Sequence, residues 1–144
     1  MNEQNYANHA RFVTGFHYVL SGLLFAGIVG SFFNIWVQFS KGESVFSAVL
    51  ITLLFICCMF LFVFTRQFPL KVQDRAIRAE EGLRYFILTG KPIDRRITIQ
   101  QIIALRFAPD EELVELTERA LKENLKPKEI KKAVKNWRPD FNRA

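Results

Sequence analysis

The chain has 144 residues, is half hydrophobic and carries a formal charge of +6 at pH 7. Apolar and charged residues are segregated: 12 of the 15 Phe lie from Phe12 to Phe68, and 18 of the 20 Lys and Arg lie from Arg66 onward. A soluble globular domain mixes both kinds at helical or strand period, so the composition argues against one and favours a membrane protein.

Residues 1–15 form a polar N-terminal segment that leads into a long apolar run. The two histidines, His9 and His17, lie at this boundary. Eight residues span about 12 Å along a helix, which is too far for both rings to bind one metal ion. We therefore expect interfacial hydrogen bonding from each histidine. The alternative is a membrane-embedded cofactor protein or enzyme that uses His9 or His17.

Two apolar runs, 16–39 and 45–65, are separated by a five-residue polar connection. Each run is long enough to cross a bilayer as a helix. A connection this short joins antiparallel neighbours, so residues 16–65 are predicted to form a transmembrane hairpin. A cleaved signal peptide is disfavoured because the first run is too long and no small-residue cleavage site closes it.

Small residues recur every fourth position in the first run, at Gly22, Ala26 and Gly30. Such a strip lets another helix approach closely. It predicts helix packing either against the second run of the same chain or against a second copy in a homodimer. In the second run, Cys57 and Cys58 are adjacent and would need distorted geometry to form a bridge, so we expect two small hydrophobic side chains.

Basic residues follow the second run directly, at Arg66, Lys71, Arg75 and Arg78, whereas the connection between the runs is neutral. By the positive-inside rule, both termini are predicted to be cytoplasmic.

Residues 66–90 predict a juxtamembrane amphipathic helix over Leu70–Leu88, with Pro69 as a break or a first helical position and Gly90 as the C-cap. Acid-before-base pairs, Asp74–Arg78 and Glu80–Arg84, support it. Such a helix could lie on the membrane or stand as a stalk. Its apolar side consists of Val72, Ala76, Ala79, Leu83, Phe86 and Ile87.

Residues 91–144 predict a small helical cytoplasmic domain. Thr98 and Gln101 form a capping box that opens a short, mostly apolar helix, which we expect at the centre of the core. Arg106 lies within it, and a buried arginine needs a partner. The nearest candidate is Asp110, four residues on, so we predict a buried Arg106–Asp110 ion pair.

Two more helices are expected, one opening at Pro109 and one running from Lys126–Pro127 to Pro139. Basic residues over an apolar stripe in the last helix predict contact with anionic lipid. Alternatively, the stripe packs on neighbouring helices while the basic side chains are solvated. Nucleic-acid tethering is supported less well, since Trp137 and Phe141 are the only aromatic residues there for base stacking. The candidate lipid contacts are Lys128, Lys131, Lys132, Lys135 and Arg138.

Several runs resemble a family of small bacterial two-span membrane proteins of unknown function. They are Val72–Arg78, Gln101–Ala108, the early Asn8-His9-Ala10-Arg11 and the late Trp137-Arg138. The resemblance implies two N-terminal spans and a charged helical tail in a bacterial protein, and we expect that protein in the inner membrane. It implies no activity.

The sequence therefore predicts an all-α protein, with a two-helix transmembrane hairpin followed by a small cytoplasmic bundle of amphipathic helices. No nucleophile–base pair, glycine-rich phosphate loop or metal-ligand spacing stands out. We expect a non-enzymatic membrane anchor or accessory subunit, without cofactor or small-molecule substrate. Its partners would be membrane lipid and either a protein docked on the tail or a second copy.

Overall fold

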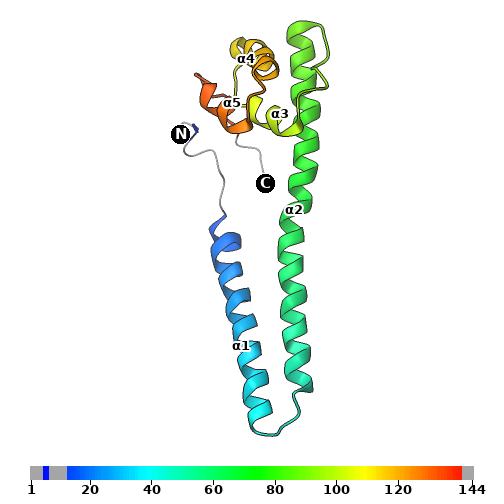
Figure 1. Cartoon of the computed structure of the whole chain (residues 1–144), viewed down its shortest axis with the longest axis vertical. Helices are drawn as coiled ribbons and strands as arrows, with labels where there is room; N and C mark the ends of the chain where they lie inside the picture. Colours follow the sequence, from blue (N-terminus) through cyan, green and yellow to red (C-terminus); the bar gives the residue numbers. More distant parts are fainter. Residues whose placement is uncertain (1–4, 7–12, 141–144) are drawn as a thin grey trace. The chain divides into compact units, whose positions relative to one another are not determined.

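The fold is all-α, as predicted (Figure 1). The computed structural model describes residues 5–6 and 13–140, so His9 lies outside the described residues. Within these ranges there is no strand. The elements are η1 (Gly15–Leu20), α1 (Ser21–Ser40), α2 (Phe46–Thr89), α3 (Ile99–Leu105), α4 (Asp110–Lys122) and α5 (Pro127–Ala133).

The chain divides into two compact units at Phe68 and Pro69. The first, called the hairpin unit, comprises Phe12–Phe68. The second, called the tail domain, comprises Met1–Arg11 and Pro69–Ala144. Helix α2 contributes residues to both units. The predicted juxtamembrane helix (66–90) and small helical domain (91–144) therefore fall largely into one unit.

In the hairpin unit, α1 and the first part of α2 lie side by side (Figure 1). The rings of Phe16 and Phe62 stack with their centroids 4.4 Å apart. Gly42 ends α1 with φ +70°, and its N–H bonds the Phe39 carbonyl while that of Glu43 bonds the Gln38 carbonyl. This is a Schellman cap, which satisfies carbonyls that a helix end would otherwise leave open.

Pro69 lies inside α2, so both predicted alternatives, a helix break and a first helical position, are wrong. A proline in a helix interior lacks one N–H donor and costs about 3 kcal/mol. Helix α2 persists because a long apolar helical run precedes the proline and the rest of the tail domain packs on the residues that follow it.

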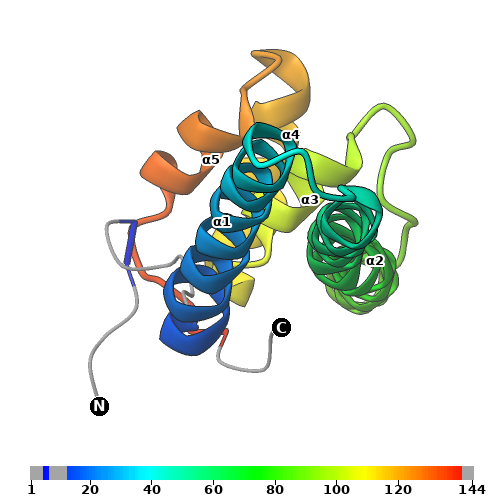
Figure 2. The ribbon, with the colours of Figure 1, turned by 90° about the horizontal axis from the view of Figure 1, so that it is seen from below.

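The core of the tail domain is built around α3, as expected. Helices α3, α4 and α5 contact one another (Figure 2). The largest fully buried side chains include Phe107, Ile102 and Leu105. The predicted capping box is confirmed, since the Thr98 N–H donates to Gln101 Oε1 at 2.8 Å and the Gln101 N–H donates to Thr98 Oγ1 at 3.3 Å. Gly90, at φ +69°, ends α2 as predicted.

Helix α5 ends at Ala133, so the predicted helix through Pro139 is wrong. The carboxylate of Glu112 on α4 accepts the backbone N–H groups of Lys135 and Asn136, at 2.9 and 3.0 Å. These bonds draw the chain out of helical geometry. The non-helical segment 134–140, here called the strap, then crosses the domain, where the backbone N–H of Arg138 donates to the Phe107 carbonyl at 2.8 Å.

Candidate functional site

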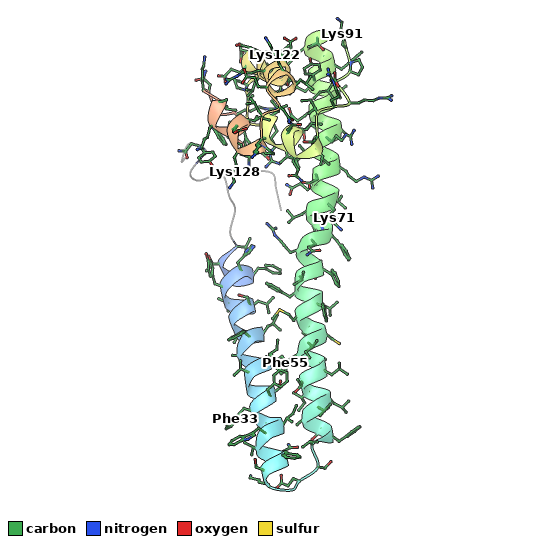
Figure 3. All side chains as sticks on the ribbon, viewed as in Figure 1. Phe33, Phe55, Lys71, Lys91, Lys122 and Lys128 are labelled. Carbon is green, nitrogen blue, oxygen red and sulfur yellow. The ribbon has the colours of Figure 1, made fainter. Side chains whose placement is uncertain are left out.

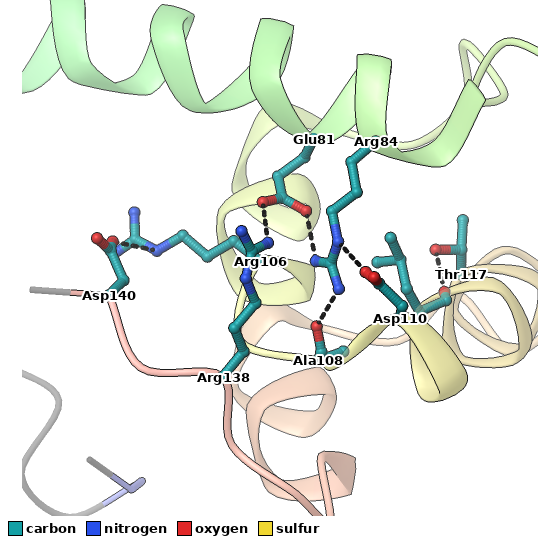
Figure 4. Close-up of polar contacts among 9 residues, drawn as sticks. Glu81, Arg84, Arg106, Ala108, Asp110, Thr117, Arg138 and Asp140 are labelled. Atoms are coloured by element: carbon teal, nitrogen blue, oxygen red, sulfur yellow. Dashed lines mark hydrogen bonds and ion pairs between the residues drawn. The ribbon is translucent and has the colours of Figure 1, made fainter. Parts of the chain in front are cut away.

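A cluster of charged side chains lies between α2, the start of α4 and the strap (Figure 4). At its centre is Glu81, whose residue surface is only 4% exposed. One carboxylate oxygen accepts from Arg84 Nη1 at 2.9 Å, and the other accepts from Arg138 Nη1 at 3.4 Å. Arg138 is 57 residues further along the chain, so the contact joins α2 to the strap.

Arg84 makes the most bonds in this cluster. Besides Glu81, its Nε donates to Asp110 Oδ1 at 2.5 Å, and its Nη2 donates to the Ala108 carbonyl at 2.8 Å. The Arg84 side chain is 12% exposed. A guanidinium has five donors in a fixed plane, which suits it to hold a helix against a turn in this way.

The predicted Arg106–Asp110 pair is wrong. Asp110 instead binds Arg84, while Arg106 Nε lies 3.2 Å from Asp140 Oδ2 in the strap. The prediction used the nearest acid in sequence. In the fold, α4 turns Asp110 toward α2, and the strap supplies the carboxylate for Arg106. The predicted Glu80–Arg84 bond is likewise replaced by Glu81–Arg84.

Burial raises the pKa of Glu81 above its ordinary value of 4.5. The hydrogen bond from Arg84, together with the charges of Arg84 and Arg138, opposes that rise, and Glu80 adds to it. Desolvation disfavours the charged form of any buried carboxyl, and here it outweighs the two arginines.

Two clefts flank the cluster. One has a volume of about 500 Å³ and includes Gln73, Ile77, Arg106 and Asp140 in its lining. The other, of about 530 Å³, lies beside Leu83, Ile87 and the start of α4. The charged groups in the cluster pair with one another, which is the arrangement of structural ion pairs that fix a strap on a helix.

Within the tail domain, α2 packs on the other helices and the strap through its more polar face. Ile77 and Glu81 are buried, and Arg84 and Tyr85 are partly buried. The opposite, apolar face is exposed: Val72 is 67%, Leu83 61% and Ile87 73% exposed. Glu81 was not among the predicted site residues, although its spacing of four from Ile77 and from Tyr85 places it on their face.

The structure gives no support for packing of the predicted glycine strip on α2, since no described atom lies within 4 Å of a Cβ built on Gly22 or Gly30. Gly22, Ala26 and Gly30 are all exposed in the described structure. The close approach of α1 to α2 is instead at the next residue, Gly27, where an added Cβ would lie only 2.2 Å from the ring of Phe55. Figure 3 shows Phe55 directed from α2 toward α1. Packing of the strip on a second copy stays a prediction.

The five candidate lipid contacts do not share one helix. Lys128, Lys131 and Lys132 lie on α5, whereas Lys135 and Arg138 lie in the strap. The Lys131 and Lys132 ammonium groups lie 5.5 and 5.7 Å from the ring centroids of Phe107 and Tyr6. Arg138 binds Glu81. Their contact with anionic lipid stays a prediction.

His17 lies in η1, a π-helical segment, and its Nδ1 is 3.1 Å from both the backbone nitrogen and the carbonyl oxygen of Val13. Its ring also contacts Phe16 edge-on. Cys57 and Cys58 are free thiols. Residues 5–6 and 13–140 hold no group of three or more His, Cys, Asp or Glu that could bind a metal ion.

Two apolar helices and a small helical domain closed by ion pairs define the class: an all-α protein with two helices long and apolar enough to cross a membrane. The whole chain, residues 1–144, matches the protein-family model described as "Family of unknown function (DUF6526)", and the chain belongs to this family. The resemblance to a family of unknown function is thus confirmed. No curated protein and no solved structure matches the chain.

Proposed function

We propose that the protein is a non-enzymatic membrane anchor of the bacterial inner membrane. Its hairpin unit spans the bilayer twice, and the tail domain on the cytoplasmic side docks a protein partner.

The observation that carries the proposal is the exposure of the two long apolar helices. Only 6% of the most apolar stretch of Gly15–Ser40 is buried within the structure, and only 11% of that of Phe46–Thr89. A core helix of a soluble protein is buried over most of such a stretch. Large exposed apolar surfaces on soluble proteins are rare, because their hydration is unfavourable, whereas lipid would cover this surface.

The orientation is inferred from the charges that flank the spans. The loop 41–45 is short and holds one Lys and one Glu, whereas the tail domain contains most of the basic residues. Basic loops remain on the cytoplasmic side during insertion. Figure 3 labels some of the basic residues of the tail domain: Lys71, Lys91, Lys122 and Lys128.

A docking role agrees with how the tail domain is built. Its charged cluster is occupied in holding the strap, so the exposed surface of the domain outside this cluster is left for a partner.

Thiol labelling tests both the spans and the orientation. In a Cys57→Ala, Cys58→Ala background, single cysteines replace Lys41 in the loop and Lys122 in α4. A membrane-impermeant maleimide applied to intact cells should label position 41 and leave position 122 unlabelled until the cells are permeabilised.

Extraction provides the matching control. The protein should stay with the membranes in alkaline carbonate, which releases peripheral proteins, and dissolve only in detergent. Release by carbonate would refute the spans, and labelling at 122 in intact cells would refute the orientation alone.

A further inference from the structure

The exposed apolar side of α2 in the tail domain forms a regular stripe. Its residues are spaced alternately by four and three positions: Val72, Ala76, Ala79, Leu83 and Phe86. All five are exposed, and α2 turns its other side to the tail domain through Ile77 and Glu81. Alternating spacings of four and three are the pattern of a coiled-coil seam, in which each residue packs between four residues of a facing helix.

We propose that this stripe packs against the same stripe of a second copy, so that two α2 helices form a short parallel seam. The inference rests on the proposed membrane anchoring in one respect: two copies held in one bilayer meet at high effective concentration.

The charges beside the stripe identify a second copy as its occupant. Arg75 and Glu80 flank the stripe on opposite sides, and both are exposed. They are five residues apart, the separation at which flanking residues of two parallel helices meet across a seam. In a parallel pair, Arg75 of each copy therefore faces Glu80 of the other. In an antiparallel pair each flanking side of the seam faces the same side of the partner, so Arg75 and Glu80, which flank opposite sides, would not meet.

The side chains of the stripe fit a close seam. Ala76 and Ala79 occupy its middle, and short side chains let two helix backbones come near each other. Leu83 and Phe86 provide bulk at one end and Val72 at the other. The rest of the tail domain packs on the side of α2 that carries Ile77 and Glu81. Ala76 and Leu83 also line the two clefts beside the cluster, but both are exposed, so the stripe is accessible in both copies.

Cysteine crosslinking in native membranes tests the seam. In the Cys57→Ala, Cys58→Ala background, Ala79→Cys should form a disulfide-linked dimer under mild oxidation. A symmetric bond between equivalent residues requires them to face each other across a two-fold axis. The matched control is Arg78→Cys, one position earlier on the same helix, exposed and off the stripe, which should crosslink several-fold less.

Charge exchange tests the pairing. Arg75→Glu and Glu80→Arg each turn two attractive pairs into two repulsive ones, so each should lower the crosslinked fraction at Ala79→Cys about threefold to tenfold. The double variant restores both pairs and should recover the crosslinking. Arg78→Glu makes the same change of charge away from the seam and should have little effect.

Two results would overturn the proposal. Equal crosslinking at positions 78 and 79 would mean random collision. A bimane at position 79 that is quenched by spin-labelled lipid, without crosslinking, would assign the stripe to the bilayer surface. Carbonate extraction separates the seam from the proposed membrane anchoring. Protein that stays in the membrane but fails to crosslink at position 79 refutes the seam and leaves the anchoring intact.

Discussion

Replacement of Arg84 by Ala tests the buried cluster most directly. The substitution removes the donors to Glu81, to Asp110 and to the Ala108 carbonyl. Asp110 has a side chain that is 59% exposed, so water can replace its partner. The Glu81 side chain is 5% exposed and retains Arg138 at 3.4 Å. The loss of stability therefore depends mainly on Glu81.

Protonation limits that loss. Breaking a buried ion pair costs about 3–5 kcal/mol, but Glu81 can instead take up a proton. In the unfolded chain Glu81 has its ordinary pKa of 4.5. Protonating the carboxylate on folding therefore costs about 3.4 kcal/mol at pH 7 and about 0.7 kcal/mol at pH 5, at about 1.4 kcal/mol per pH unit. With about 1 kcal/mol for the Ala108 carbonyl, we expect Arg84→Ala to lose about 2–4 kcal/mol at pH 7 and about 1–2 kcal/mol at pH 5.

The sign follows from linkage. The folded-state pKa of Glu81 is already raised, so its contribution to stability is fully present below pH 4.5 and is lost as the pH rises through the folded value. Without Arg84 the folded-state pKa rises further, which makes the variant gain stability relative to wild type as the pH falls from 7 to 5.

Urea unfolding of the full chain in non-ionic detergent micelles measures the effect. Trp36→Phe leaves Trp137, whose ring centroid is 4.7 Å from that of Phe107, as the fluorescent reporter of the tail domain. The matched control is Arg119→Ala, which breaks the Arg119–Glu123 pair, half-exposed at 52% and 47%, and should cost less than about 1 kcal/mol. Equal losses in the two variants, or a loss at Arg84 that does not shrink toward pH 5, would refute the reasoning.

Three further predictions concern other parts of the chain. Gly27→Val should lower the thermal midpoint of helix loss in micelles, because its Cβ would lie 2.2 Å from the Phe55 ring, whereas Gly22→Val, with no described atom within 4 Å of that position, should be tolerated. Trp137→Ala should destabilise the tail domain by about 3 kcal/mol in hydrogen exchange of α3 amides, since the strap loses its packing on Phe107; unchanged exchange would separate the strap from the core. Hydrogen bonds from Arg96 lower the pKa of Asp94 to about 2, so its contribution to stability is present above the ordinary value of 3.8 and is lost as the pH falls through about 2. An NMR titration should show that midpoint, and Arg96→Ala should return it toward 3.8.

Local rules explain what the sequence predicted well. The Thr98–Gln101 capping box and the Gly90 cap depend on residues within one helical turn, and both are as expected. The length and composition of the two apolar runs likewise predicted two helices that could cross a membrane.

Contacts between distant residues explain the errors. Arg106 pairs with Asp140 because the strap crosses the domain, and the strap exists because Glu112 ends α5 early. Neither step follows from local spacing. The period of α2 predicted its apolar side, but the side that packs carries Glu81 and Arg84. Their partners Ala108, Asp110 and Arg138 lie 24, 26 and 57 residues away in the sequence.

The 57 residues between Glu81 and Arg138 affect the order in which the chain folds while it is being synthesised. The ribosome makes Glu81 well before Arg138, so the nascent chain carries a carboxylate without its second guanidinium while α3, α4 and α5 are being made. During this interval the burial of Glu81 is less favourable than in the finished protein, and water remains the better environment for its charge. We therefore expect the hairpin to enter the membrane first and the tail domain to close afterwards, when the strap has left the ribosome and can bind α2.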